Sequence, residues 1–378
     1  MSGADRLRIV VSGMVAGVPG QGGATWAVLQ YVLGLRELGH DVMLIEPVED
    51  HEDPRRDRYF QEVVAAFGLE GRAALVRGEE RTTGVSYAEL LRFARSADLL
   101  VNIAGMLRDE KLAEAVPVRA YLDLDPAFTQ LWQEHDGIDM RLGGHTHFVT
   151  VGLRIGRGAK LVPDCGRSWI TTLPPVVLTH WPPGGPVRHH AFTTVANWRG
   201  YGSIDYDGIR LGQKAHSVRE LLELPAHPRR RVLLALAIHA DERRDLDALA
   251  AAGWELADPE RVAGTPGHYR GFVAGSLAEL GVAKSGYVAS WCGWFSDRSA
   301  CYLASARPVV AQDTGFGAVL PTGSGLMAFK DAHGAAAAMD AVLSNPTAHR
   351  RAARQIAEEH LASDVVLSRL LDQLGAVA

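Results

Sequence analysis

The chain has 378 residues, a net charge of −5 and 22% charged residues, a composition typical of folded globular proteins. This charge balance gives no reason to expect a general nucleic-acid binder or a membrane-surface protein. The length exceeds that of a usual single domain, so we expect two domains.

Three cysteines, Cys165, Cys292 and Cys301, form no C-x-x-C pair and fit neither a disulfide framework nor a zinc site. The first residues lack the apolar region of a signal peptide, and no apolar run is long enough to span a bilayer. We therefore expect a cytoplasmic protein without a membrane span.

The first half of the sequence alternates short β-rich runs with helical patterns. Strands are predicted at residues 8–13, 41–47, 98–105, 118–125 and 147–153, and helices at residues 24–40, 59–69 and 86–97. Strands separated by helices indicate βαβ units and a parallel sheet.

Proline and glycine interrupt this pattern between residues 162 and 186, in VPDCG, LPPVV and WPPGGP. The alternation then restarts, with strands predicted at residues 189–198, 231–238 and 308–313, helices at residues 213–224 and 242–253, and helical sequence from residue 332 onward. We expect an α/β fold of two facing Rossmann-like, doubly wound parallel-sheet domains with a helical C-terminus. The domains are predicted at residues 1–185 and 186–378, and the last helix is a candidate to cross back to the first domain. The ligand is expected in the cleft where the strands' carboxyl ends face each other.

A glycine-rich loop, GMVAGVPGQGGATW, follows the first strand and opens the first helix, where backbone amides can hold a phosphate. The dinucleotide spacing G-x-G-x-x-G fails at Thr25, and no G-K-[ST] is present. Glu46, at the end of the second strand, nevertheless stands where an acid that binds the ribose of NAD would lie. We interpret Gly22 and Gly23 as part of a loop that covers a ligand, with a purely structural turn as the alternative.

Three residues of the first half are candidate catalytic groups. Asp125 follows a predicted strand at its carboxyl end and is either a site residue or the cap of the next helix. His145 and His147, in GGHTHF, are candidate general bases or ordinary hydrogen-bonded histidines. They have no third ligand of fitting pattern nearby, so we predict no metal site.

The second half holds the candidate anion site. Asn197 and Trp198 end a predicted strand, and Lys214 opens the helical region that follows, where a lysine can reach a diphosphate. In WFSDRSACYLASARPVVAQDTGFG, Ser296 and Asp297 are predicted to cap a helix whose free amides attract an anion.

Arg298, in the first turn of that helix, adds a planar fork that suits a phosphate. Asp313, Thr314 and Gly315 form a turn after the next strand, where Asp313 can accept hydrogen bonds from sugar hydroxyls. Together these features favour a sugar diphosphate as the ligand. The alternative is a capped core helix followed by a surface turn.

The run A-x-x-R-P-V-V-x-x-D-T-G-F resembles the donor-binding end of GT-B glycosyltransferases, and GGATWAVLQYVLGLRELGHDV looks like their first loop and helix. A closer match is a bacterial group carrying GWFSDR. The resemblance implies metal-independent transfer, with the nucleotide sugar held mainly by the second domain and the acceptor mainly by the first. It implies a pyrophosphate role for Arg298 and Lys214. Many retaining members carry E-x7-E where this chain has Gly293 and Cys301, so no catalytic base carries over.

We therefore expect a glycosyltransferase that moves a sugar, a hexose or a related one, from a nucleotide diphosphate to an unidentified small-molecule or glycan acceptor. The nucleotide sugar is a co-substrate, no cofactor is expected, and nucleic acid is not an expected partner. The predicted donor-binding residues are Gly22, Gly23, Asn197, Trp198, Lys214, Gly293, Ser296, Asp297, Arg298, Asp313, Thr314 and Gly315. The alternatives are a nucleotide-sugar epimerase of the same fold, an NAD-dependent oxidoreductase and a non-catalytic sugar-nucleotide-binding protein.

Overall fold

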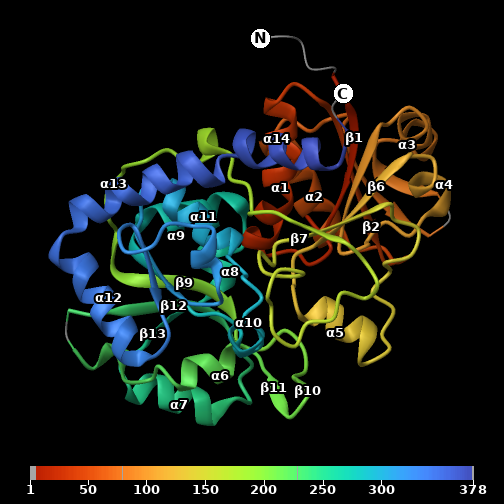
Figure 1. Ribbon diagram of the computed structural model, residues 1–378. Coiled ribbons are helices and arrows are strands. Elements are labelled where there is room, and N and C mark those ends of the chain that lie inside the picture. Colours follow the sequence, from red (N-terminus) through yellow and green to blue (C-terminus); the bar gives the residue numbers. More distant parts are fainter. Residues whose placement is uncertain (1–5, 79, 228, 377–378) are drawn as a thin grey trace.

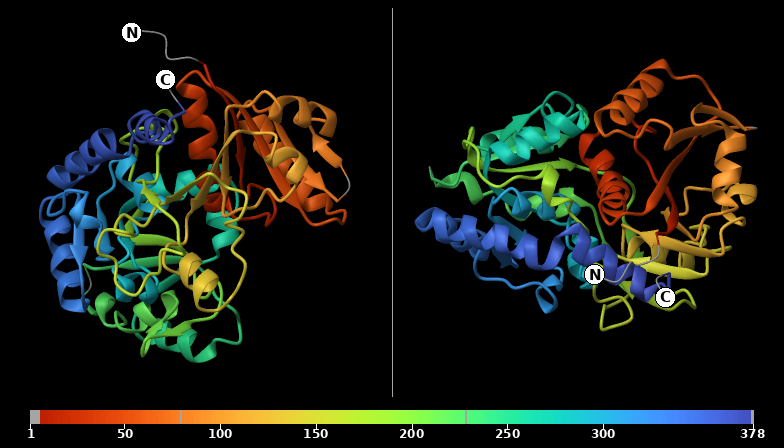
Figure 2. Two further views of the ribbon diagram at one scale, coloured as in Figure 1. Left: turned by 45° about the vertical axis from the view of Figure 1, so that its right-hand side comes forward. Right: turned by 90° about the horizontal axis from the view of Figure 1, so that it is seen from above.

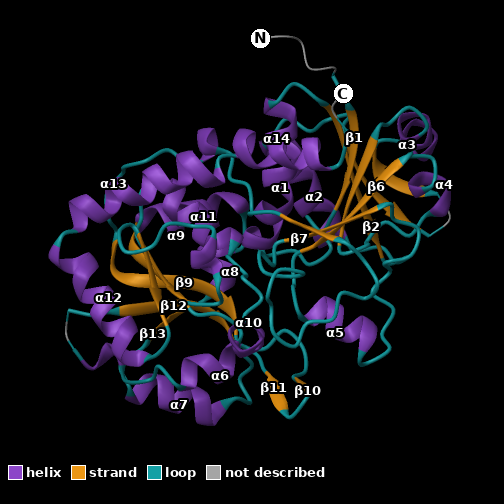
Figure 3. Ribbon diagram, viewed as in Figure 1, coloured by secondary structure: helices purple, strands orange, loops and turns teal. Residues whose placement is uncertain are grey.

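The structure is a computed structural model that describes residues 6–78, 80–227 and 229–376. Two sheets, each with helices packed on both faces, make up most of the molecule (Figures 1 and 3). Among the described residues, no helix combines the length and apolar character needed to cross a membrane.

The first sheet has the strand order β4-β3-β2-β1-β5-β6-β7-β8. Its strands are β1 (Arg8–Ser12), β2 (Asp41–Val48), β3 (Ala73–Arg77), β4 (Arg81–Gly84), β5 (Leu99–Ile103), β6 (Val118–Asp123), β7 (His147–Thr150) and β8 (Trp169–Thr171). Its helices are α1 (Gly22–Glu37), α2 (Pro54–Ala66), α3 (Tyr87–Ala94), α4 (Glu110–Ala113) and α5 (Phe128–Glu134). Strand β4 runs antiparallel to β3, and the other neighbouring strands pair in parallel.

Both faces of the first sheet are buried, which explains its nearly continuous apolar strands. Because side chains alternate along a strand, Ile9 and Val11 join the core formed with α1, whereas Val10 joins a separate core formed with α3.

The second sheet has the order β13-β12-β9-β14-β15-β16, and all of its neighbouring strands are parallel. Its strands are β9 (His189–Asn197), β12 (Val232–Ala237), β13 (Glu255–Ala257), β14 (Ser276–Gly281), β15 (Val309–Gln312) and β16 (Leu326–Phe329), and a separate hairpin pairs β10 (Ile204–Tyr206) with β11 (Ile209–Leu211). Its helices are α6 (Lys214–Arg219), α7 (Arg243–Ala251), α8 (Pro259–Ala263), α9 (Pro266–Gly275), α10 (Ser285–Ser290), α11 (Asp297–Ala304), α12 (Ala332–Ser344), α13 (Pro346–Ile356) and α14 (Ser363–Gln373), with a π-helical turn at Ala357–Leu361 between the last two.

The two sheets share the arrangement of their central strands. Strand β1 lies between β2 and β5, and β9 lies between β12 and β14, so in each sheet the direction of winding reverses beside its first strand. Ligands of such sheets bind outside the carboxyl ends of the strands at this switch point. The expected α/β fold of two doubly wound parallel sheets with a helical C-terminus is confirmed.

The C-terminal helices run from the second sheet to α1 (Figures 1 and 2). Helix α14 packs on α1, where a Cβ added at Gly34 would lie 2.6 Å from Cδ1 of Leu367. One hydrophobic core includes side chains of β1 and α1 together with side chains of α11 and α14. The division into domains at residues 185 and 186 falls between β8 and β9 and stays a prediction.

Candidate functional site

A cleft of about 710 Å³ lies between the two sheets at the carboxyl ends of their strands. Loops from both halves line it, including the segments after β6, β9, β12 and β14. The predicted site residues that line it are Gly23, Asp125, Asn197, Lys214, Ser296, Asp297 and Arg298.

Arg298 forms a buried ion pair on the second-sheet side of the cleft. Its Nε donates to Oε1 of Glu279 at 2.6 Å, and its Nη1 donates to the carbonyl of Val195 at 3.0 Å. Glu279 is fully buried on the central strand β14. Burial opposes the charge of Arg298, but the Glu279 carboxylate raises its pKa above the ordinary value. Its Nη2 is buried without a hydrogen-bond partner among the described residues, so this guanidinium retains an unused donor.

Lys214, at the start of α6, is a second buried cation in the cleft. Its Nζ donates to the carbonyl of Val282, and the described residues include no carboxylate within ion-pair distance of it. Burial lowers the pKa of Lys214 well below its ordinary value, and the neighbouring charges of Arg298 and Lys284 lower it further. An anion bound here would stabilise the charged form of the lysine.

Asp125, contributed by the first half, forms a network with three residues of the second half. Nζ of Lys284 lies 3.0 and 2.9 Å from its two carboxylate oxygens. The hydroxyl of Tyr201 donates to Oδ2 at 2.6 Å, and the hydroxyl of Tyr287 donates to Oδ1. Both oxygens of this candidate base are therefore engaged.

At another part of the cleft lining, Arg55 near the start of α2 pairs with Glu260 of α8. Both side chains are exposed, so the pair contributes little stability in water. This pair is a second bridge between the two halves, in addition to the pair of Asp125 and Lys284.

The predicted cap of α11 is confirmed. The side-chain oxygen of Ser296 accepts a hydrogen bond from the amide of Arg298 at 3.2 Å. Asp297 opens the helix beside it and also lines the cleft. Burial raises the pKa of Asp297, although the nearby charge of Arg298 acts in the opposite direction.

Gly22 and Gly23 lie in the first turn of α1, not in the loop before it. A Cβ at Gly22 would lie 2.2 Å from the carbonyl oxygen of Thr265, so this glycine permits close contact between the halves and does not itself line the cleft. Gly23 packs on the ring of Tyr269, which lines the cleft with it.

Trp198, Gly293, Asp313, Thr314 and Gly315 are not among the residues that line the cleft. The indole of Trp198 is buried, and its Nε1 donates to Asp245 at 2.9 Å. The amide of Gly293 donates to the carbonyl of Thr314 at 2.7 Å, and the amide of Gly315 donates to Asp313 at 2.9 Å.

Gly293 and Gly315 lie against Arg154 of the first half. A Cβ at Gly293 would lie 2.8 Å from the backbone nitrogen of Arg154, and one at Gly315 would lie 2.5 Å from its Cδ. Both glycines have positive φ, of 80° and 97°. The donor-binding roles predicted for Gly293, Asp313, Thr314 and Gly315 stay predictions.

The two predicted histidines lie at and just before the start of β7. His147 begins β7 and is paired with Ala120, three residues before Asp123 in β6. His145 lies edge-on to Tyr121, with its Nε2 3.0 Å from Nδ2 of Asn102. Neither histidine lines the cleft, and their catalytic role stays a prediction.

Glu46 stabilises the glycine-rich loop. Its carboxylate accepts hydrogen bonds from the amides of Ala16 and Gly17 at 2.8 and 2.6 Å. Burial raises its pKa to about 7, against the opposing effect of these amides. Its position after β2 thus has a structural explanation that does not involve a ribose.

Residues that the sequence did not single out complete the cleft. Tyr201, Lys284, Tyr287 and Trp294 line it, and the rings of Tyr287 and Trp294 have centroids 4.6 Å apart. Lys284 and Tyr287 follow β14, a strand absent from the prediction. Recognition of that strand would have identified the segment as one that reaches the switch point.

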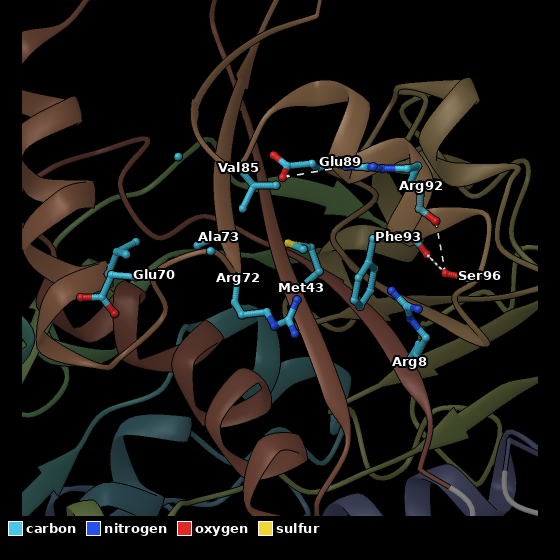
Figure 4. A pocket seen from close by; sticks show the side chains of 13 residues that line it. Arg8, Met43, Glu70, Arg72, Ala73, Val85, Glu89, Arg92, Phe93 and Ser96 are labelled. Atoms are coloured by element: carbon cyan, nitrogen blue, oxygen red, sulfur yellow. Dashed lines mark hydrogen bonds and ion pairs between the residues drawn. The ribbon is translucent and has the colours of Figure 1, made fainter.

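A separate hollow of about 630 Å³ lies near the amino ends of β1 and β3 (Figure 4). Arg8 stacks over the ring of Phe93 there, with its Cζ 4.5 Å from the ring centroid. Arg8 and Arg72 both face Asp41, and Arg92 faces Glu89. These arginines therefore have carboxylate partners, whereas Lys214 in the cleft has none among the described residues.

No family model matches the chain, and no curated protein matches it. Solved glycosyltransferase structures do match it along nearly its whole length. Anabaena Alr3699/HepE in complex with UDP-glucose is 11% identical with a TM-score of 0.59, covering 97% of this chain and 99% of that one. An alpha-glucosyltransferase in complex with UDP and a 13-mer DNA is 11% identical with a TM-score of 0.60, covering 98% and 99%. AviGT4, a glycosyltransferase involved in avilamycin A biosynthesis, is 16% identical with a TM-score of 0.56, covering 98% and 97%.

The chain has the GT-B fold. This agreement confirms the fold that the resemblance in the sequence implied. The narrower likeness to a bacterial group carrying GWFSDR stays a prediction.

Proposed function

We propose that this GT-B protein is a glycosyltransferase that takes a nucleoside diphosphate sugar as its donor. The observation that carries the proposal is the arrangement of Lys214 and Arg298 in the cleft. Lys214 is a buried cation without a described carboxylate partner, and Arg298 has a buried nitrogen without a hydrogen-bond partner. A diphosphate supplies both the missing charge and the missing acceptors.

The solved structures of the same fold support this choice of donor. HepE is known in complex with UDP-glucose, and the pneumococcal O-GlcNAc transferase GtfA in complex with UDP and GlcNAc. We therefore propose a UDP-sugar, with a hexose or related sugar, as the first donor to test. The acceptor would enter from the side of the first sheet.

In the proposed reaction, an acceptor hydroxyl or amine attacks the anomeric carbon of the sugar. The bond from that carbon to the diphosphate oxygen breaks, and its electron pair stays on the diphosphate. Lys214 and Arg298 stabilise this developing charge in place of a metal ion. The acceptor's proton passes to Asp125, which the first half contributes to the cleft lining.

The NAD-dependent alternative rested on Glu46, whose carboxylate oxygens accept hydrogen bonds from loop amides. Nothing in the cleft lining specifically favours it over a nucleotide sugar. We also propose a cytoplasmic location, in keeping with three cysteines that are free in the structure.

A thermal-shift screen against UDP, GDP, ADP and dTDP and their sugars tests this function. A ligand at a hundred times its Kd adds about 2.7 kcal/mol to the free energy of unfolding, so binding raises the melting temperature. We expect UDP and a UDP-sugar to stabilise the protein. We also expect the protein to release UDP slowly from the sugar nucleotide. If none of these nucleotides and nucleotide sugars, at millimolar concentration, raises the melting temperature, the proposal is refuted.

A further inference from the structure

Asp125 and a bound diphosphate would both attract the same cation of the cleft, Lys284. Asp125 and Lys284 both line the cleft, and their side chains remain 27% and 22% exposed. Lys284 lies close enough to Lys214 for its charge to act on that lysine, and Arg298 acts on Lys214 as well. The three cations therefore form one group, and Lys284 is the member that is paired with a carboxylate of the opposite half.

Aromatic rings hold Lys284 in this position. Its Nζ lies 4.3 Å from the ring centroid of Tyr201, 5.0 Å from that of Tyr287 and 5.3 Å from that of Phe128. Such cation–π contacts favour a charged ammonium at this point. The rings do not neutralise it, so it can still be attracted by a second anion.

Asp125 can lose Lys284 without becoming an unpartnered carboxylate. Burial raises the pKa of Tyr201 well above its ordinary value, and the charge of Asp125 raises it further, so the phenol keeps its proton. Tyr201 and Tyr287 then remain as donors to Oδ2 and Oδ1. Departure of Lys284 would leave lone pairs of the carboxylate free to accept an additional proton or hydrogen bond.

We propose that Lys284 is a further donor-binding residue, shared between Asp125 and the diphosphate of the sugar nucleotide. In the free protein Lys284 pairs with Asp125, and the carboxylate oxygens of this candidate base accept hydrogen bonds from it. When a diphosphate binds at Lys214 and Arg298, the ammonium turns toward it, and Asp125 becomes available to the acceptor. This inference rests on the proposed function, because it requires a diphosphate in the cleft.

The proposal predicts an increase in affinity from the loss of a carboxylate. In the Asp125→Asn variant, Lys284 no longer has a charged partner, and a negative charge is gone from the cleft. We expect this variant to bind UDP about tenfold more tightly than the wild type, a change of ~1.4 kcal/mol. Lys284→Met should bind UDP about tenfold more weakly. The gain from Asp125→Asn should disappear when Lys284 is already Met.

Calorimetric titration with UDP at constant ionic strength measures these four affinities, and circular dichroism and melting temperature check that each variant is folded. Asp340→Asn is the matched control, because it makes the same change to a carboxylate whose partner, Arg230, lies outside the cleft lining. Its UDP affinity should stay within about twofold of the wild type. If Asp125→Asn does not fold, Asp125→Ser takes its place.

Each result of these titrations either supports or refutes a role for Lys284 in diphosphate binding. Unchanged or weaker UDP binding by a folded Asp125→Asn variant would show that the pair merely joins the two halves. A gain that persists beside Lys284→Met would reflect charge repulsion without any role for Lys284, and would also overturn the proposal. A wild-type protein that binds no nucleoside diphosphate would refute the proposed function itself. Normal wild-type binding with a flat mutant cycle would refute this inference alone.

Discussion

Removal of Arg298 should affect stability as well as donor binding, because its partner Glu279 is fully buried on β14. A substitution that removes the arginine and leaves a buried carboxylate unpaired typically lowers the free energy of unfolding by about 3–5 kcal/mol. Arg298→Met, which keeps much of the apolar volume, should therefore be destabilised by that amount.

The double variant Glu279→Gln/Arg298→Met separates the two effects. Replacement of both members of a buried pair is often close to neutral, so the double variant should recover most of the lost stability. Its affinity for UDP should remain low, because a hydrogen bond to a charged group is worth about 1.5–3 kcal/mol, or roughly ten- to a hundredfold in Kd.

Urea denaturation and calorimetry with UDP on the wild type, the single variant and the double variant provide the measurements. Wild-type UDP affinity in a folded double variant would remove Arg298 from the donor site. Unchanged stability of Arg298→Met would show that Glu279 does not depend on the guanidinium.

Three further outcomes are expected. Sugar transfer should persist in EDTA, because the proposed stabilisers of the leaving group are Lys214 and Arg298; activity that vanishes in EDTA and returns with magnesium or manganese would contradict this mechanism. Gly22→Val should lower the free energy of unfolding by about 1–3 kcal/mol, because its side chain would meet the backbone of Thr265. Gly143→Ala, which enters open space, is the control and should have little effect in the same urea titration. The raised pKa of Glu46 should make stability fall by up to ~3 kcal/mol as pH rises from 4.5 to about 7, because its folded state holds a proton that the unfolded state releases. Glu46→Gln should flatten that pH dependence in denaturation curves, and an unchanged slope would assign it to other groups.

The sequence predicted the fold through patterns that depend on local chemistry. Apolar runs marked strands such as β1 and β12, and Ser296 marked the start of α11. Strand β14 was missed because its sequence, SLAELG, contains a glutamate at a position that is buried in the sheet. The reason for this glutamate lies in Arg298, a contact between two elements that no local pattern displays.

The residues of the candidate site were predicted only where local sequence marks them. Lys214 is identifiable because it opens a predicted helix after a predicted strand, and Arg298 because it lies in the first turn of a helix with a predicted cap. Tyr201 and Lys284 reach Asp125 from 76 and 159 residues away, so their meeting depends on how the two halves pack. The turn at Asp313 resembles a ligand loop, and its donor-binding role stays a prediction; one carboxylate oxygen of Asp313 accepts a hydrogen bond from the amide of Gly315.

The packing of α14 on α1 limits how this chain can be recombined with others of its fold. A chimera made by joining residues 1–185 to a foreign second half would lose the helix that covers α1, and one made with residues 186–378 would carry a helix with no matching surface. The fit is narrow, since even one methyl group at Gly34 would meet Leu367. A functional exchange of halves would therefore have to transfer Ser363–Gln373 together with the N-terminal sequence, as a noncontiguous unit.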